Sequence, residues 1–130
     1  MINSIMIITN DVIFPNYFIN LLVGIMNAVH IVVCDSFDDI DDQLTNSNCS
    51  FILLDGALTR FSSIEIIYHL RYVSHTTVPI WFFPEVHNEG YINKSIEVGA
   101  TRIIKKPFNP HVICREIKIF FEGENVFVTT

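Results

Sequence analysis

Four large apolar residues at positions 51–54 run directly into Asp55, and Gly56 follows. A continuous apolar run of this length, ended by a turn residue, is typical of a strand buried on both faces. Such strands belong to parallel sheets covered by helices, in which ligands and chemistry gather at the carboxyl ends of the strands. The run therefore predicts that Asp55 lies at the rim of a sheet, at the end of a central strand.

Two other stretches also place a charged residue just after an expected strand. The run at 5–9 leads through an asparagine into Asp11, and the run at 102–105 leads into Lys106. If the three strands are parallel neighbours, their carboxyl ends meet at one edge of the sheet. The sequence thus predicts that the side chains of Asp11, Asp55 and Lys106 converge.

The remaining chain alternates apolar runs with amphipathic segments, joined by short loops. Five strands alternating with five helices predict parallel β-α-β units with right-handed crossovers. We expect an α/β fold: a doubly wound, five-stranded parallel sheet of order 2-1-3-4-5, with helices on both faces. The expected strands are 4–9, 29–34, 49–54, 78–83 and 102–105, and the expected helices are about 15–26, 36–45, 62–72, 88–98 and 110–121.

A break is expected at 122–125, where a glycine lies between two glutamates. We therefore predict one domain at 1–121, and take 122–130 as a tail or as the start of a linker to an effector domain. The net charge of −6 argues against a grip on a nucleic-acid backbone by this domain alone. Apolar runs all fall short of the ~18 residues needed to cross a bilayer, so we expect no membrane partner.

The three cysteines, Cys34, Cys49 and Cys114, are odd in number and show no pairing pattern. Together with the lack of a basic region ahead of the first apolar stretch, they predict reduced thiols in the cytoplasm, packed in or near the core. The five histidines show no metal-ligand spacing. One of them, His30, lies inside an apolar run and is expected to be at least half-buried.

Two neighbouring carboxylates repel each other unless a cation lies between them. Mg²⁺ suits such a place, because it binds one or two carboxylates together with phosphate oxygens. The chemistry that uses this arrangement is phosphoryl transfer onto a carboxylate, with Asp55 as the nucleophile and Lys106 neutralising a phosphoryl oxygen. The plainer alternative is that Asp55 only caps the turn that follows its strand.

These features resemble the receiver domain of bacterial two-component response regulators, the CheY-like family. The similarity spans 5–121 and rests on Asp11, on Leu53-Leu54-Asp55, on Gly99-Ala100 and on Lys106-Pro107-Phe108. The resemblance implies that Asp55 is the phosphoacceptor and that Asp11 and the backbone carbonyl of Ala57 join it as Mg²⁺ ligands. It also implies a cis bond between Lys106 and Pro107.

The family further implies a histidine kinase or a phosphotransfer protein as the partner. It implies no independent enzyme, and at most self-catalysed phosphoryl transfer onto Asp55. The fourth helix, fifth strand and fifth helix form the usual partner surface in this family, which fits a homodimer or a linked effector domain.

Several positions depart from the family pattern, among them Leu58-Thr59 and Ser62-Ser63 in the loop after Asp55. Asn10 stands where a second acidic residue is usual, so it is at most a weaker Mg²⁺ ligand. The switch hydroxyl falls on Pro84, which has none, and the usual aromatic partner falls on Ile103. The hydroxyl of Thr59 or of Ser62, both in the segment after Asp55, could replace the missing switch hydroxyl.

These departures leave two readings of the function. In the first, the domain accepts phosphate at Asp55 and has an altered output switch. In the second, it is a phosphorylation-independent pseudo-receiver that works as a protein-interaction module. A flavodoxin-like cofactor binder is a weaker third reading, because the loop at 10–15 lacks the Gly, Ser and Thr of a phosphate cradle.

Overall fold

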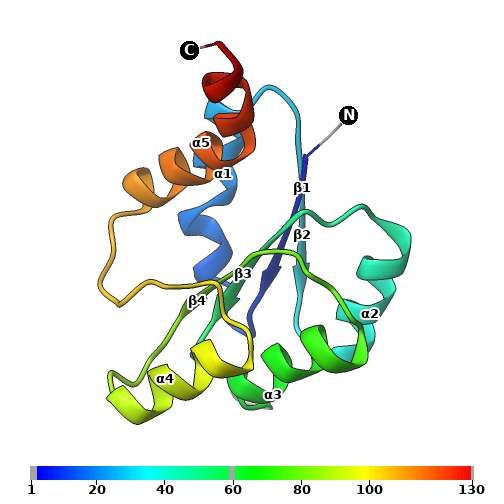
Figure 1. The fold of residues 1–130 in the computed structure, drawn as a ribbon, viewed down its shortest axis with the longest axis vertical. Helices are drawn as coiled ribbons and strands as arrows, with labels where there is room; N and C mark the ends of the chain where they lie inside the picture. Colours follow the sequence, from blue (N-terminus) through cyan, green and yellow to red (C-terminus); the bar gives the residue numbers. More distant parts are fainter. Residues whose placement is uncertain (1–2, 59–60, 130) are drawn as a thin grey trace.

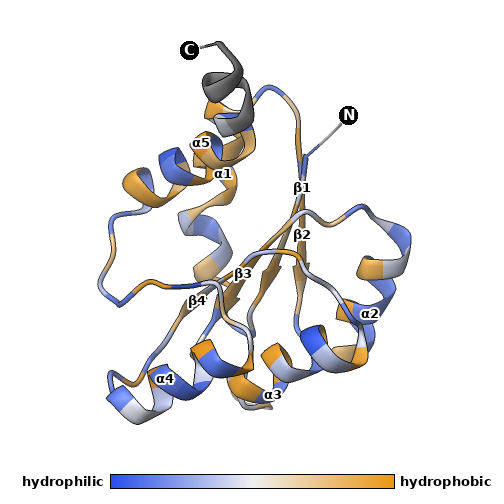
Figure 2. Ribbon diagram, in the orientation of Figure 1, coloured by the Kyte–Doolittle hydropathy of each residue, from blue (hydrophilic) through white to orange (hydrophobic). Residues whose placement is uncertain are grey.

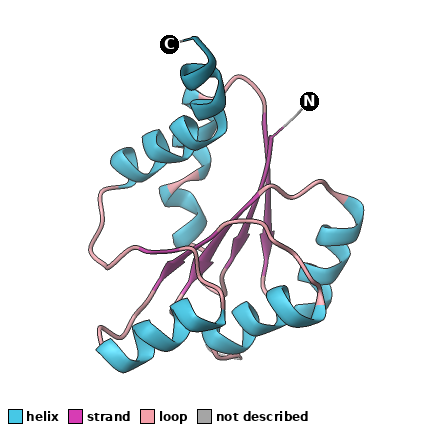
Figure 3. Ribbon diagram, in the orientation of Figure 1, coloured by secondary structure: helices cyan, strands magenta, loops and turns pink. Residues whose placement is uncertain are grey.

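The computed structural model describes residues 3–58 and 61–129, with side chains as far as Gly123. Five parallel strands form one sheet in the predicted order β2-β1-β3-β4-β5, and their arrowheads point the same way in Figure 3. The strands are β1 (Asn3–Ile8), β2 (Val29–Cys34), β3 (Phe51–Asp55), β4 (Ile80–Phe83) and β5 (Arg102–Ile103). The helices are η1 (Phe14–Tyr17), α1 (Ile19–Ile25), α2 (Phe37–Asn46), α3 (Ser63–Tyr68), η2 (His69–Val73), α4 (Glu89–Val98) and α5 (Pro110–Thr129).

Alternate residues of the central strands supply two hydrophobic cores, one on each face of the sheet. On β3, Phe51 and Leu53 join the core beneath α1 and α5, whereas Ile52 and Leu54 join the core beneath α2, α3 and α4. Figure 1 shows these two layers of helices on opposite sides of the strands, and Figure 2 shows how hydrophobic the strands between them are. The two-sided burial explains the continuous apolar run at 51–54.

The edge strand β2 is less buried than its sequence suggests. His30 is exposed, so the expectation that it is at least half-buried is wrong. An edge strand has a partner on one side only, and the helices cover its faces less completely than those of β1 and β3. Cys34 at the end of β2 is buried, as is Cys114, while Cys49 is partly buried, as predicted.

Side-chain caps are present at two of the three helix N-termini for which the sequence predicts them. The Ser36 hydroxyl accepts a hydrogen bond from the backbone of Asp39 at 3.1 Å, and Asn88 accepts one from the backbone of Tyr91 at 3.0 Å. Ser62 makes no such bond, although a capping box was expected there. The first predicted helix is divided into η1 and α1, because a tight 3₁₀ turn begins around the proline.

The break predicted at 122–125 is wrong, because α5 runs on as helix from Pro110 to Thr129. A helical glycine costs only about 1 kcal/mol relative to alanine, which an established helix can sustain. Lys118 and Glu122 also form an ion pair of 3.3 Å one helical turn apart, just before Gly123. Among the residues that the structure describes, no helix has the length and apolarity to span a membrane.

Gly99 closes α4 in a conformation with φ = +132°, as the predicted left-handed helix end requires. Its carbonyl accepts hydrogen bonds of 3.1 and 2.9 Å from the Arg71 guanidinium, which also donates to the carbonyls of Thr76 and Val78. Arg71 therefore ties η2, the approach to β4 and the end of α4 together.

Candidate functional site

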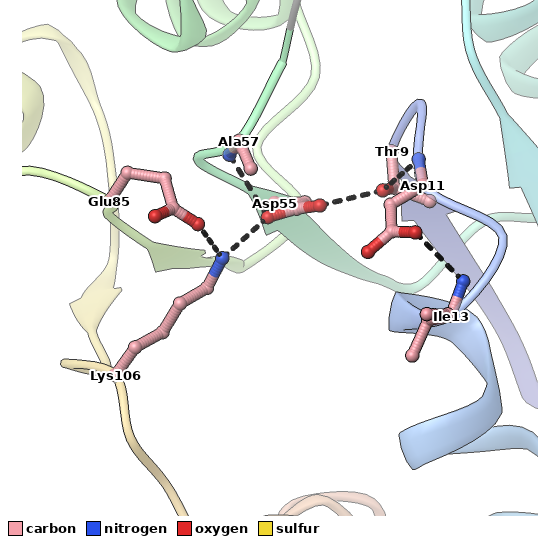
Figure 4. A network of polar contacts seen from close by, with 7 residues as sticks. All are labelled: Thr9, Asp11, Ile13, Asp55, Ala57, Glu85 and Lys106. Carbon is pink, nitrogen blue, oxygen red and sulfur yellow. Dashed lines mark hydrogen bonds and ion pairs between the residues drawn. The ribbon is translucent and has the colours of Figure 1, made fainter.

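Asp55 lies at the carboxyl end of β3, between the ends of β1 and β4. Figure 4 shows Lys106 and Glu85 on one side of its carboxylate and Thr9 and Asp11 on the other. The parallel register brings them there, because β1 and β4 both pair with β3 and end at the same edge of the sheet. The three residues whose convergence the sequence predicted do lie at one edge.

Both oxygens of the Asp55 carboxylate accept hydrogen bonds, and its side chain is only 1% exposed. Oδ1 accepts from Lys106 Nζ at 2.9 Å and from the backbone N–H of Ala57 at 3.0 Å. Oδ2 accepts from the hydroxyl of Thr9 at 2.7 Å. A buried carboxylate is tolerable only with such partners, and here they also fix its orientation.

Asp11 is exposed and held by its own loop. Its Oδ1 accepts a hydrogen bond of 3.0 Å from the backbone N–H of Ile13. Its backbone N–H donates to the Thr9 hydroxyl at 3.0 Å. Thr9 thus accepts from the Asp11 backbone and donates to Asp55, which couples the two acidic residues through one buried hydroxyl.

Lys106 bridges two carboxylates. Besides the bond to Asp55, its ammonium donates to Oε1 of Glu85 at 2.6 Å. Burial lowers the pKa of Lys106, but the hydrogen bonds and charges of Glu85 and Asp55 outweigh this effect, so the net shift is upward. The lysine therefore carries its charge throughout the physiological range, and the Lys106–Pro107 bond is cis, as the resemblance implied.

Gly56 has a steric reason to be glycine. A Cβ atom there would lie 2.5 Å from the backbone oxygen of Phe83 and 2.8 Å from the Cα of Pro84. The chain passes this close because the Gly56 N–H donates to the Phe83 oxygen at 2.8 Å. The contact locks the turn after Asp55 against the end of β4.

The residues that depart from the family pattern have defined surroundings in the structure. Pro84 is buried beside Gly56, and Ile103 pairs with Phe82 and packs, partly buried, against the core under α2, α3 and α4. The side-chain nitrogen of Asn10 donates to the backbone oxygen of Asp35 at 3.3 Å. Ser62 is exposed, and Thr59 lies outside the described residues.

Sequence reasoning missed two residues of this site. Thr9 was read only as the last residue of a strand, although a hydroxyl beside a rim carboxylate was a usable signal. Glu85 was not singled out because its pairing with Lys106 joins loops 21 positions apart. No local pattern marks a contact of that kind.

A hollow of about 370 Å³ opens beside the carboxylates. Its charged lining consists of Asp11, Glu85 and Lys106, and the rest is mostly aromatic and proline side chains: Phe14, Tyr17, Pro107, Phe108 and Pro110. The hollow gives an anionic group a route from solvent to the Lys106 ammonium.

The donor chemistry of the rim suits a hard cation. Two carboxylates, Asp11 and Asp55, and the backbone carbonyl of Ala57 are the oxygen ligands that Mg²⁺ prefers. Among the side chains that the structure describes, no group of three or more His, Cys, Asp or Glu could hold a metal ion.

Similarity to known proteins agrees with this geometry. The family model of the response regulator receiver domain matches residues 5–118. A curated relative, the response regulator protein GraR of Staphylococcus saprophyticus, is 26% identical over 87 residues. That match covers 67% of this chain and 38% of GraR, so the chain spans well under half of this relative.

Solved structures share the fold at low sequence identity. The signal receiver domain of a DNA-binding response regulator from Colwellia psychrerythraea superposes with a TM-score of 0.80 at 18% identity, covering 92% of this chain and 98% of that one. The chemotaxis response regulator CheY4 of Vibrio cholerae gives a TM-score of 0.75 at 14% identity, with 91% and 98% covered. With the family match over most of its length and the Asp11, Asp55 and Lys106 side chains at one rim, the chain belongs to the response regulator receiver domain family of two-component systems.

Proposed function

We propose that this receiver domain accepts a phosphoryl group on Asp55, from the phosphohistidine of a histidine kinase or a phosphotransfer protein, in the cytoplasm. The observation that carries the proposal is the 2.9 Å contact between Lys106 Nζ and the buried Asp55 carboxylate, at the rim to which Asp11 also belongs. Family membership supports the same donor class.

In the proposed step, an Asp55 carboxylate oxygen attacks the phosphorus atom of the donor. A P–O bond to Asp55 forms as the P–N bond to the donor imidazole breaks, and the imidazole nitrogen keeps the electron pair. Lys106 donates to a phosphoryl oxygen as the anionic phosphoryl group moves to Asp55. When Mg²⁺ is bound, Asp11, Asp55 and the Ala57 carbonyl would hold it, with Asn10 contributing at most weakly, and it would neutralise part of the negative charge of the phosphoryl group.

The output of such a domain differs from the usual pattern, because Pro84 has no hydroxyl to donate to a phosphoryl group and Ile103 is not aromatic. We place the partner surface on α4, β5 and α5, toward a second copy or an effector domain. A buried aspartate with Pro84 and Ile103 at the switch positions also suits the phosphorylation-independent module, so the test must separate the two.

The test is the intact mass of the protein after incubation with acetyl phosphate and Mg²⁺. The proposal expects the mass gain of one phosphoryl group, absent in Asp55→Ala and lost on treatment with hydroxylamine, which converts an acyl phosphate into a hydroxamate and free phosphate. A variant of an exposed acid outside the site, Glu89→Gln, should behave as the wild type. No gain in wild type or in any variant that keeps Asp55 would leave the interaction module as the function.

A further inference from the structure

Glu85 reaches the lysine that the proposed reaction needs. It follows β4 directly after Pro84, and its Oε1 lies 2.6 Å from Lys106 Nζ, closer than the Asp55 oxygen at 2.9 Å. The Glu85 side chain is 50% exposed, whereas that of Asp55 is 1% exposed. The ammonium therefore lies between an inner carboxylate and an outer one that faces solvent.

Glu85 occupies an N–H group of Lys106 that could otherwise donate to an incoming phosphoryl oxygen. A lysine ammonium has three N–H donors. In the described structure Asp55 takes one and Glu85 takes another, which leaves one for a phosphoryl oxygen. Glu85 also lines the hollow that leads to Lys106.

The charges that line the hollow also oppose the entry of an anionic phosphodonor. The hollow is lined by two carboxylates, Asp11 and Glu85, against the single ammonium of Lys106. An anionic donor entering it meets repulsion from both acids and competes with Glu85 for the Lys106 ammonium. Asp11 lies beside Asp55 on the side away from Lys106, so Glu85 is the acid that contacts the lysine from outside (Figure 4).

We propose that Glu85 is an anionic gate that selects among phosphodonors by competing with the incoming phosphoryl group for Lys106. The inference rests on the function proposed above. The gate slows free dianionic donors more than monoanionic ones, because both the repulsion and the competition grow with the donor's charge. Opening of the Glu85–Lys106 pair frees a second N–H donor of Lys106 for the incoming phosphoryl group.

A purely structural ion pair predicts something else. An ion pair this exposed contributes little to folding stability, and its removal would leave phosphoryl uptake unchanged. The gate predicts that Glu85→Gln changes stability little but accelerates uptake. The two roles are therefore separable with a variant that keeps the shape of the side chain.

The experiment compares wild type, Glu85→Gln and Glu89→Gln by intact mass over time, with acetyl phosphate as dianionic donor and phosphoramidate as monoanionic donor. Glu89 is also exposed, so its variant removes the same charge outside the site. We expect Glu85→Gln to be phosphorylated about three- to tenfold faster by acetyl phosphate, with a smaller gain for phosphoramidate and no change in Glu89→Gln. A parallel titration with beryllofluoride, a monoanionic non-covalent phosphoryl mimic, should show tighter binding to Glu85→Gln, by a factor comparable to the gain for phosphoramidate.

Equal rates and equal beryllofluoride affinities in wild type and Glu85→Gln would overturn the gate, as would an equal gain in Glu89→Gln. Uptake by Glu85→Gln but not by wild type would support it. If no protein takes up phosphate, the proposed function fails and beryllofluoride affinity decides the gate: tighter binding to Glu85→Gln upholds it, and unchanged or absent binding refutes it.

Discussion

The hydroxyl of Thr9 donates a 2.7 Å hydrogen bond to Oδ2 of Asp55, across 46 positions of sequence. Both groups are buried: Thr9 is 2% exposed and Asp55 is 1% exposed. The same hydroxyl oxygen accepts from the backbone N–H of Asp11. One small side chain at the end of β1 therefore aligns the candidate nucleophile and positions the loop that carries the second acid.

Replacing Thr9 with valine keeps the shape of the side chain and removes the hydroxyl. The Asp55 carboxylate then loses a buried donor, and the Asp11 backbone loses an acceptor. We expect the free energy of unfolding to fall by about 1–3 kcal/mol, measured by urea denaturation. Thr9→Ser retains the hydroxyl and should recover most of the loss, whereas a valine variant as stable as wild type would contradict the role of this bond.

Replacing Lys106 with methionine leaves the Asp55 carboxylate buried without its cationic partner. Because an unpaired buried charge is costly, we expect a loss of about 2–4 kcal/mol in the free energy of unfolding. The matched control is Asp55→Asn combined with Lys106→Met, which removes both charges. The double variant should lose less than the two single losses added together, and simple additivity would show that the pair is not coupled.

Replacing Gly56 with alanine forces a Cβ atom to within 2.5 Å of the Phe83 backbone oxygen. Since backbone has to move to relieve this contact, we expect a loss of about 2–4 kcal/mol. Gly24→Ala in α1 is the control, because a Cβ there meets nothing within 4 Å. That variant should be neutral or more stable by up to about 1 kcal/mol, since alanine is the better helix former. Equal thermal melting temperatures for the two variants would count against the close packing at Gly56.

Two buried thiols should be unreactive in the folded protein. Burial, together with the charge of Asp39 and weaker neighbours, raises the pKa of Cys34 to about 12, and burial raises the pKa of Cys114 to about 11. The thiolate is the reactive form, so the raised pKa keeps Cys34 almost entirely in its unreactive thiol form near pH 8. Native protein should react with Ellman's reagent slowly at these two positions and rapidly after unfolding in urea, and fast native labelling of Cys34 would refute this.

The same shifts make stability depend on alkaline pH. The pKa of both thiols is raised above the 9.0 of an ordinary cysteine, so the folded protein keeps protons that the unfolded chain has lost. The stability is therefore complete below about pH 9 and falls as pH rises toward the folded-state values. Between about pH 7.5 and 10, the free energy of unfolding should decrease less in Cys34→Ala combined with Cys114→Ala than in wild type.

The sequence by itself determined the strands, their order and the convergence of three side chains. The apolar runs at 5–9 and 51–54 predict a sheet that is buried on both faces. The alternation of strands with helices predicts that this sheet is doubly wound. Asp11, Asp55 and Lys106 follow from that topology, because each lies at or just beyond the end of a strand. Local patterns also gave the caps at Ser36 and Asn88 and the left-handed Gly99.

Only the tertiary structure decided which groups touch Asp55. The hydroxyl of Thr9 and the carboxylate of Glu85 meet the site through contacts 46 and 21 positions apart, and no local periodicity encodes such distances. The predicted break at 122–125 is wrong because α5 is already stabilised along its length, so the small free-energy cost of Gly123 does not end the helix. The order of residues decides where polar side chains follow the strands, whereas packing in three dimensions decides which of them form hydrogen bonds or ion pairs with one another.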